Sequence, residues 1–187
     1  MANRNTQGFG LVAAGTLGQT PATSGQGKYK IDAGYGTTIY QNGAVASSAG
    51  YIIDGQTTDA PILGVLNGIF YNAATTLKPT FANFYKQPIT PANSEDIDAF
   101  VFDNPQQQYV VATDDAVAQA GYLETYDMNT SAGSDTTGKS SATLDIADTS
   151  ADAASFRLLR SAEDPENDEN AAFRSVVVCI NLIELQS

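Results

Sequence analysis

The chain alternates apolar and polar residues over short stretches that turn residues separate, a pattern typical of β-strands. The most apolar stretch of the first half, residues 62–71, follows a turn-rich segment that ends at Pro61. A short apolar run between turn residues predicts a strand that is buried on both faces. Gly64 and Gly68 favour a strand, because each would cost a helix interior about 1 kcal/mol relative to alanine. In a strand, such glycines indicate a bulge, a bend or the close approach of another backbone.

Further strands are expected wherever this pattern recurs. They cover residues 28–32, 37–40, 44–46, 51–53, 97–102, 108–112, 156–159 and 176–183, the last of which is expected to be central. Asn42 and Gly43 predict a hairpin turn of type I′, since both residue types tolerate positive φ. One short helix is expected between a capping Thr113 and a terminating Gly121. The fold class predicted is therefore mainly β, a small β-barrel or sandwich with at most one short helix and an extended N-terminal arm.

The domain organisation follows from where large apolar residues begin. Residues 1–26 are rich in Gly, Thr, Ala, Gln and Asn, and cannot bury enough surface to offset their own ordering entropy. They are interpreted as an extended arm, and residues 27–187 as a single β-rich domain. A frayed terminus is the alternative for the arm. The pattern Gly8, Phe9, Gly10, Leu11, Val12 favours an arm that becomes ordered on a partner, so these five residues are candidates for partner binding.

A second candidate surface lies in the proline-rich segment 72–91. Prolines disfavour a helix here, so an irregular loop or a short edge strand is expected. Phe81, Phe84 and Tyr85 are its aromatic residues and form a possible contact loop. Packing beneath the loop, contact with a protein, and stacking on a sugar or base are the alternatives for these side chains.

The composition excludes several classes of binding and catalytic site. The net charge is −12 with scattered Lys and Arg, so no nucleic-acid partner is expected. The chain has no His, which removes Ser-His-Asp and Cys-His catalysis and every His-ligated metal site. Its single cysteine, Cys179, lies in an apolar run and is expected to be a small buried residue. We therefore expect no enzyme activity, no cofactor and no metal site.

Residues 133–140, Gly-Ser-Asp-Thr-Thr-Gly-Lys-Ser, match the phosphate-binding pattern G-x-x-x-x-G-K-[ST]. That pattern binds phosphate where a buried strand delivers the loop and a helix begins at the lysine. Neither flank has the required character, because residues 127–132 are not apolar and residues 141–146 alternate like a strand. A structural turn is the favoured interpretation, and a nucleotide-binding enzyme is the alternative.

Acidic residues offer the remaining candidate chemistry. Residues 163–170 could bind calcium through oxygen ligands, but they lack the spacing of an EF-hand loop, and a solvated loop is the favoured interpretation. Asp96 with Asp98, or Asp114 with Asp115, could be imagined as an acid/base pair, although nothing in the sequence places either pair across a cleft. The N-terminal residues do not resemble a signal peptide and no apolar run is long enough to span a membrane, so synthesis in a cytoplasm and no membrane partner are expected.

One set of short motifs occurs in a recognisable order along the chain. Its members are Gly8–Val12, Leu63-Gly64-Val65, Gly68, Tyr71, Thr137-Gly138-Lys139-Ser140, Leu144-Asp145, Phe156-Arg157-Leu158-Leu159, Pro165, Asn167 and Val176-Val177-Val178-Cys179-Ile180-Asn181. This order resembles a family of small structural proteins of tailed bacteriophages, the head decoration or cement proteins. Ile183 stands where that family often has histidine, and the arm lacks the family's usual Arg-Pro.

The resemblance implies a virion protein on the capsid exterior, made in the host cytoplasm. It implies a homotrimer that sits near three-fold or quasi-three-fold axes, binds the major capsid protein and bridges capsomers. A tail or fibre component is the alternative within the virion, and no shaft repeat supports it. A secreted carbohydrate-binding module is the remaining alternative, which the absence of Trp disfavours.

Overall fold

The computed structural model describes residues 3, 5–18, 25–55, 61–129, 133–147, 155–168, 170–181 and 184–186. Its strands are β1 (Val12–Thr16), β2 (Gly27–Ile31), β3 (Ala44–Ser48), β4 (Tyr51–Asp54), β5 (Gly64–Asn72), β6 (Pro79–Ala82), β7 (Ile97–Phe102), β8 (Gln107–Ala112), β9 (Thr125–Tyr126), β10 (Met128–Asn129), β11 (Thr143–Leu144), β12 (Phe156–Ser161) and β13 (Ser175–Ile180). Its helical elements are the 3-10 turns η1 (Ala92–Ser94), η2 (Gln119–Gly121) and η3 (Glu184–Gln186). The predicted mainly β class is confirmed, but the sheets are antiparallel and open, so the barrel alternative is wrong.

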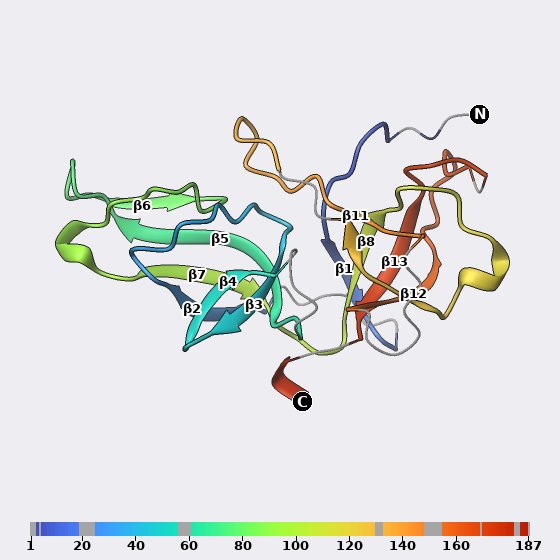
Figure 1. The fold of residues 1–187 in the computed structure, drawn as a ribbon, viewed down its shortest axis with the longest axis horizontal. Coiled ribbons are helices and arrows are strands. Elements are labelled where there is room, and N and C mark those ends of the chain that lie inside the picture. Colours follow the sequence, from blue (N-terminus) through green and yellow to red (C-terminus); the bar gives the residue numbers. More distant parts are fainter. Residues whose placement is uncertain are drawn as a thin grey trace.

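The strands form two lobes that lie side by side (Figure 1). One lobe contains a five-stranded sheet in the order β1-β8-β13-β12-β9. Every residue of β13 is buried, as expected for the central strand of this sheet. Val176, Val178 and Ile180 pack in the core of this lobe, and Val177 and Cys179 on the opposite face are also buried. The small β10–β11 ladder belongs to the same lobe.

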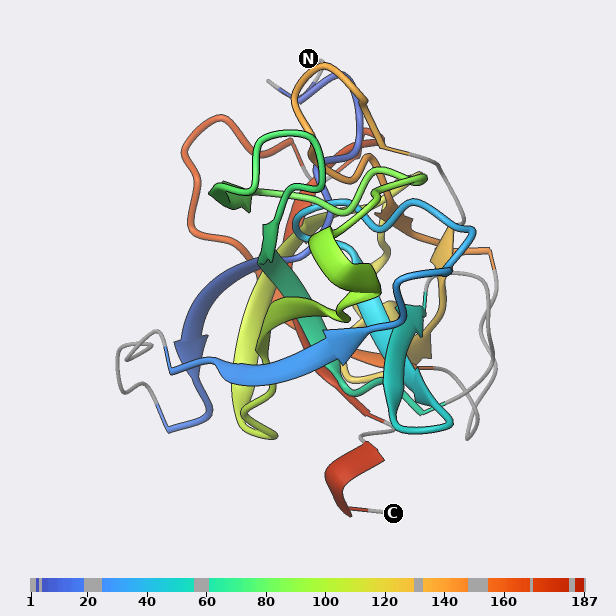
Figure 2. The ribbon, with the colours of Figure 1, turned by 90° about the vertical axis from the view of Figure 1, so that its left-hand side faces the viewer.

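The other lobe contains a six-stranded sheet organised around β5. One edge of β5 pairs with β7 along its length, and β7 in turn pairs with β2. The opposite edge is divided, because the start of β5 pairs with β3 and its end pairs with β6. In Figure 2, which looks onto this lobe, the sheet curls so that β2 approaches the β3–β4 hairpin.

The two hydrophobic cores meet at the start of β5. Val65 packs in the core of the five-stranded lobe, whereas the next residue, Leu66, packs in the core of the six-stranded lobe. Successive side chains of a strand point to opposite faces, so this end of the sheet is covered on both faces. The predicted strand at 62–71, buried on both faces, is therefore confirmed for its first half.

Both glycines of β5 have the predicted role. A Cβ at Gly64 would overlap the backbone carbonyl oxygen of Phe102, so only glycine allows β7 to pair this closely. The register between β5 and β7 shifts between Leu66 and Gly68, which is the predicted bulge.

Three local predictions are wrong. The strand expected at 37–40 is reduced to a single bridge between Ile39 and Tyr85. The expected hairpin turn at Asn42 and Gly43 does not form. Gln41 bridges to Lys139 in another loop, and a turn closes one residue earlier, with the N–H of Gly43 donating to the carbonyl of Tyr40 at 3.0 Å and only Asn42 at positive φ. The two-residue hairpin loop is instead Ala49–Gly50, between β3 and β4, where both residues have positive φ as a type I′ turn requires.

The expected helix at 113–121 is also replaced. The N–H of Thr113 donates to the carbonyl of Arg174 at 2.9 Å, and the N–H of Asp114 donates to the carbonyl of Leu144 at 3.0 Å. These bonds tie the start of the segment to neighbouring strands, and only η2 forms at its end. None of the helical elements in the described ranges is long and apolar enough to cross a lipid bilayer.

Part of the predicted arm belongs to a sheet. Residues 12–16 form β1, an edge strand that pairs with β8 of the same chain. Residues 1, 2, 4 and 19–24 of the arm lie outside the described residues.

Candidate functional site

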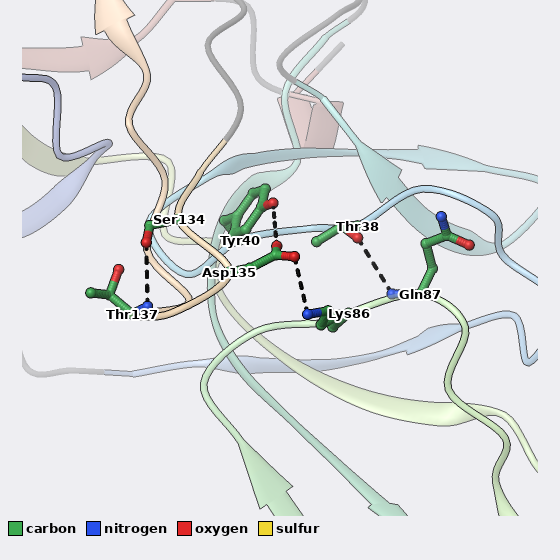
Figure 3. Close-up of polar contacts among 7 residues, drawn as sticks. All are labelled: Thr38, Tyr40, Lys86, Gln87, Ser134, Asp135 and Thr137. Atoms are coloured by element: carbon green, nitrogen blue, oxygen red, sulfur yellow. Dashed lines mark hydrogen bonds and ion pairs between the residues drawn. The ribbon is translucent and has the colours of Figure 1, made fainter.

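Three loops meet in a polar and aromatic cluster between the lobes (Figure 3). The hydroxyl of Tyr40 donates to Oδ1 of Asp135 at 2.7 Å, and Nζ of Lys86 lies 3.0 Å from Oδ2 of the same carboxylate. The Tyr40 ring stacks on Phe84 with 5.7 Å between centroids and 5° between planes. These contacts join the loop at 38–41, the loop at 83–87 and the loop at 133–140.

The electrostatics of this cluster favour a structural role. Burial and the hydrogen bond to Asp135 raise the pKa of Tyr40. The hydrogen bond from Tyr40, together with Lys86, lowers the pKa of Asp135. The two groups therefore move away from neutral pH in opposite directions, so they are not matched for proton exchange with a substrate at pH 7.

The sequence match to a phosphate loop forms a tight β-type loop. Gly133 and Ser140 form an antiparallel bridge, the N–H of Ser134 donates to the carbonyl of Lys139 at 2.9 Å, and the N–H of Gly138 donates to the carbonyl of Ser134 at 2.7 Å. These N–H groups are used inside the loop, and no helix follows within residues 133–147. The strand–loop–helix geometry that holds a nucleotide phosphate is therefore not formed here.

The arm residues proposed for partner binding lie largely within the chain's own fold. Gly8, Gly10 and Leu11 are buried, and the N–H of Leu11 donates to the carbonyl of Asn42 at 2.8 Å. A Cβ at Gly8 would overlap the carbonyl oxygen of Ser141. Phe9 is half-buried and Val12 is 40% exposed, so these two side chains are the part of the motif that faces outward.

The structure does not gather the three aromatic residues of the predicted contact loop on one surface. Tyr85 is fully buried in the core of the six-stranded lobe, where its hydroxyl donates to the carbonyl of Tyr35 at 2.6 Å. Phe84 is half-buried against Tyr40. Phe81, on the edge strand β6, is 65% exposed and is the member of the set that faces solvent.

The carboxylate pairs considered for acid/base chemistry are held by other groups. Oδ1 of Asp114 accepts from the N–H of Ile146 at 2.9 Å, and Oδ1 of Asp115 accepts from the N–H of Ala116 at 2.7 Å. Asp98 forms ion pairs with the ammonium groups of two lysines, as described below. Asp96 and Asp98 both line the pocket described below, where the lysine pairing of Asp98 leaves it unsuited to act as a free acid or base.

The acidic segment 163–170 is organised by asparagine side chains. Nδ2 of Asn167 donates to the carbonyl of Ser175 at 2.8 Å, and Oδ1 accepts from the N–H of the same residue at 2.9 Å. Asn3 donates to the carbonyl of Ala172 at 2.9 Å and so fastens the N-terminal segment to this loop. Within the described parts of the chain, no group of three or more acidic, His or Cys residues is arranged to hold a metal ion.

Sequence reasoning missed an aromatic surface on the outer face of the six-stranded sheet, which we call the aromatic face. It consists of Phe70, Phe81 and Phe100, and none of the three belongs to either core. Phe70 pairs with Phe81 across β5 and β6, and the rings of Phe81 and Phe100 lie 6.0 Å apart. A Cβ at Gly68 would stand 3.0 Å from the Phe81 ring, so this glycine lies directly beneath it. Phe100 shares the polar side of the 97–102 alternation with Asp98, which is the signal that could have revealed this face.

A pocket of about 280 Å³ continues the aromatic face toward η1, at the end of the lobe far from the five-stranded sheet. The residues that line it include Lys30, Phe70, Tyr71, Glu95, Asp96 and Asp98. Asp98 forms two ion pairs: Oδ2 lies 2.7 Å from Nζ of Lys28, and Oδ1 lies 2.6 Å from Nζ of Lys30. Burial raises the pKa of Asp98, but the hydrogen bonds from the two lysines outweigh it and the net shift is downward. The hydrogen bond to Asp98 raises the pKa of Lys30, and the charges of Asp96 and Glu95 add to this effect.

Comparisons with known proteins assign no family to the chain. No protein-family model matches it, and neither the curated proteins nor the solved structures contain a match. Function is therefore inferred from the surfaces described above.

Proposed function

We propose that this chain is a structural virion protein, a decoration or cement protein that binds the outside of an icosahedral phage head. The observation that carries the proposal is the exposed apolar surface at β6, where Phe81 is 65% exposed and Leu77 is 74% exposed. Phe81 adjoins Phe70 and Phe100 on the aromatic face, and in a chain with a net charge of −12 such an apolar surface indicates a site that another protein covers. The resemblance to phage head proteins suggests the major capsid protein as that partner.

The mechanism proposed is additive burial. Each copy places apolar surface and sheet edges against neighbouring shell subunits, and binding to the closed shell stabilises that shell by mass action. The two open sheets suit this role, because they present β1 and β6 as edge strands on a framework with two packed cores. Assembly as a homotrimer near three-fold or quasi-three-fold axes is part of the proposal.

Electron microscopy of heads assembled with and without the protein tests this function. We expect density outside the shell at three-fold or quasi-three-fold positions, and heads that burst at a lower temperature when the protein is missing. Density confined to a tail or fibre would replace the proposal with the other virion role. Unchanged heat stability with no added density would overturn it.

A matched pair of variants tests the surface. Phe81→Ser removes an exposed apolar side chain on β6, and Leu123→Ser removes one, 62% exposed, from the other lobe. We expect the Phe81 variant to lose at least about tenfold in affinity for empty heads, as apolar contacts at an interface centre do. The Leu123 variant should stay within about twofold. Equal losses, or none, would contradict the assignment of this surface.

A further inference from the structure

The pocket beside the aromatic face has more negative than positive side chains. Asp98 is already neutralised, because Lys28 and Lys30 both lie within 3 Å of its carboxylate oxygens. Asp96 accepts a hydrogen bond from the neutral hydroxyl of Tyr51 at 3.2 Å, and Glu95 makes no ion pair within the described ranges. Two lysines therefore face three carboxylates on this part of the sheet, and the carboxylates of Glu95 and Asp96 in the pocket lining remain available to a cation.

One wall of the pocket is aromatic. Phe70, near the end of β5, lines it on the same face as Phe81 and Phe100. Lys30 and Tyr71 also line the pocket, although Tyr71 packs against the core of the six-stranded lobe. An aromatic ring attracts a cation placed over its face, and guanidinium groups also stack on such rings. Continuity with Phe81 and Phe100 means that an apolar residue next to that cation would lie on the aromatic face.

We infer that this pocket binds the guanidinium side chain of an arginine on the partner protein, while apolar residues next to that arginine cover the aromatic face. Arginine fits better than lysine, because its planar donors can reach two carboxylates while it lies against a ring. A volume of about 280 Å³ accommodates one such side chain. The inference deepens the proposed function by naming the chemistry of the partner, and it rests on that function where the partner is called a shell protein.

The direct test uses N-acetyl-arginine methylamide as the probe and follows backbone amide resonances of the full-length protein by NMR. We expect saturable shifts confined to residues 70–72 and 95–98, with a dissociation constant in the millimolar range. N-acetyl-citrulline methylamide, which has nearly the same shape and no charge, should produce no saturable shift. Equal shifts with both probes, or no shift with either, would overturn the inference.

Variants separate the pocket from general charge. Glu95→Gln with Asp96→Asn removes both available carboxylates and retains an oxygen that can accept from Tyr51. Asp164→Asn with Glu166→Gln makes the same charge change in the loop after β12. We expect the pocket variant to lose the arginine response and the loop variant to keep it. A response that survives in the pocket variant would contradict the assignment of the site.

Binding to empty heads then distinguishes failure of the inference from failure of the proposed function. The pocket variant should bind heads about tenfold more weakly than the loop variant, with a flatter dependence on salt concentration. If neither the unaltered protein nor any variant binds heads, the proposed function fails, and the probe titration alone decides the chemistry of the pocket. If all bind heads equally, the function stands and the inference that a partner arginine occupies the pocket fails.

Discussion

The two ends of β5 have opposite surroundings. At its start, Val65 and Leu66 are fully buried in two different cores, so both faces of the strand are covered. At its end, Phe70 and Tyr71 are half-buried and line an open pocket. A single strand therefore connects the joint between the lobes to the surface that we assign to a partner. The buried core contacts lie at one end of the strand, and the proposed recognition surface lies at the other.

The two glycines of β5 reflect the same division. Gly64 lies against the backbone of β7, which cannot move without breaking a ladder. Gly68 lies beneath the Phe81 ring. A Cβ added to Gly68 would stand 3.0 Å from the carbonyl oxygen of Ala82. Part of the space at Gly68 is therefore bounded by an edge strand and a side chain, which adjust more easily than a central ladder.

The largest effect is expected from Gly64→Val. Its side chain would overlap the Phe102 carbonyl and stand 2.7 Å or less from Val101, so the pairing of β5 with β7 must open. We expect a loss of at least about 4 kcal/mol in the free energy of unfolding, measured by urea denaturation. Gly36→Val is the control, because nothing lies within 4 Å of its added Cβ. A loss equal to that of the control would show that β5 is not fixed at its start.

Leu66→Ala should have the next largest effect. The side chain is fully buried, so its removal leaves a cavity in the core of the six-stranded lobe. We expect a loss of about 3 kcal/mol. Phe70→Ala, at the other end of the strand, should cost only about 1 kcal/mol, because the ring is already half in water. Similar losses at both positions would remove the contrast between the two ends.

Gly68→Ala should have a smaller effect on stability and a specific effect on the aromatic face. The added methyl group would stand 3.0 Å from the Phe81 ring, which must tilt away. We expect a loss of about 1 kcal/mol and a change in the NMR signals of the Phe81 and Phe100 rings. Unchanged ring signals would show that Phe81 does not rest on Gly68.

The smallest effect concerns Asp98, which joins β2 to β7 through its two lysines. Its pKa in the folded protein is lowered from 3.8, so its contribution to stability is present above that value and is lost as the pH falls through the folded pKa. Asp98→Asn should therefore flatten the loss of stability between roughly pH 5 and pH 2. The difference should stay below about 1 kcal/mol, because both lysines are largely exposed. Parallel curves for the two proteins would contradict this role.

The strands were predictable where the signal is local. The apolar run at 62–71, its glycines and the apolar strand near the C-terminus all carry their information within a few residues. The type I′ turn was placed wrongly because Asn42 and Gly43 have the favoured residue types, whereas Ala49 takes positive φ against its own preference. The helix at 113–121 failed because so short a helix depends on tertiary contacts, and here those contacts hold Thr113 in a strand bridge.

The surfaces were less predictable than the strands. The sequence does not distinguish the surroundings of the three aromatic residues in the 81–85 loop. In the fold, Phe81 is exposed, Phe84 stacks on Tyr40 and Tyr85 is buried. Which face of β7 remains open depends on the pairing of β2, β5 and β6 around it, and that pairing joins distant parts of the chain. The aromatic face and its pocket therefore appear only once the sheet is assembled.

The ladder between β1 and β8 has a consequence for biosynthesis. The side chain of Gln107 donates to the carbonyl of Gly15, 92 residues earlier, so β1 leaves the ribosome well before its partner β8. At about 5–20 residues per second this interval lasts roughly 5–20 s. During that time the nascent β1 segment must stay free of wrong pairings. Its scarcity of large apolar side chains, which makes the segment look unstructured in the sequence, protects it from misassociation until β8 emerges.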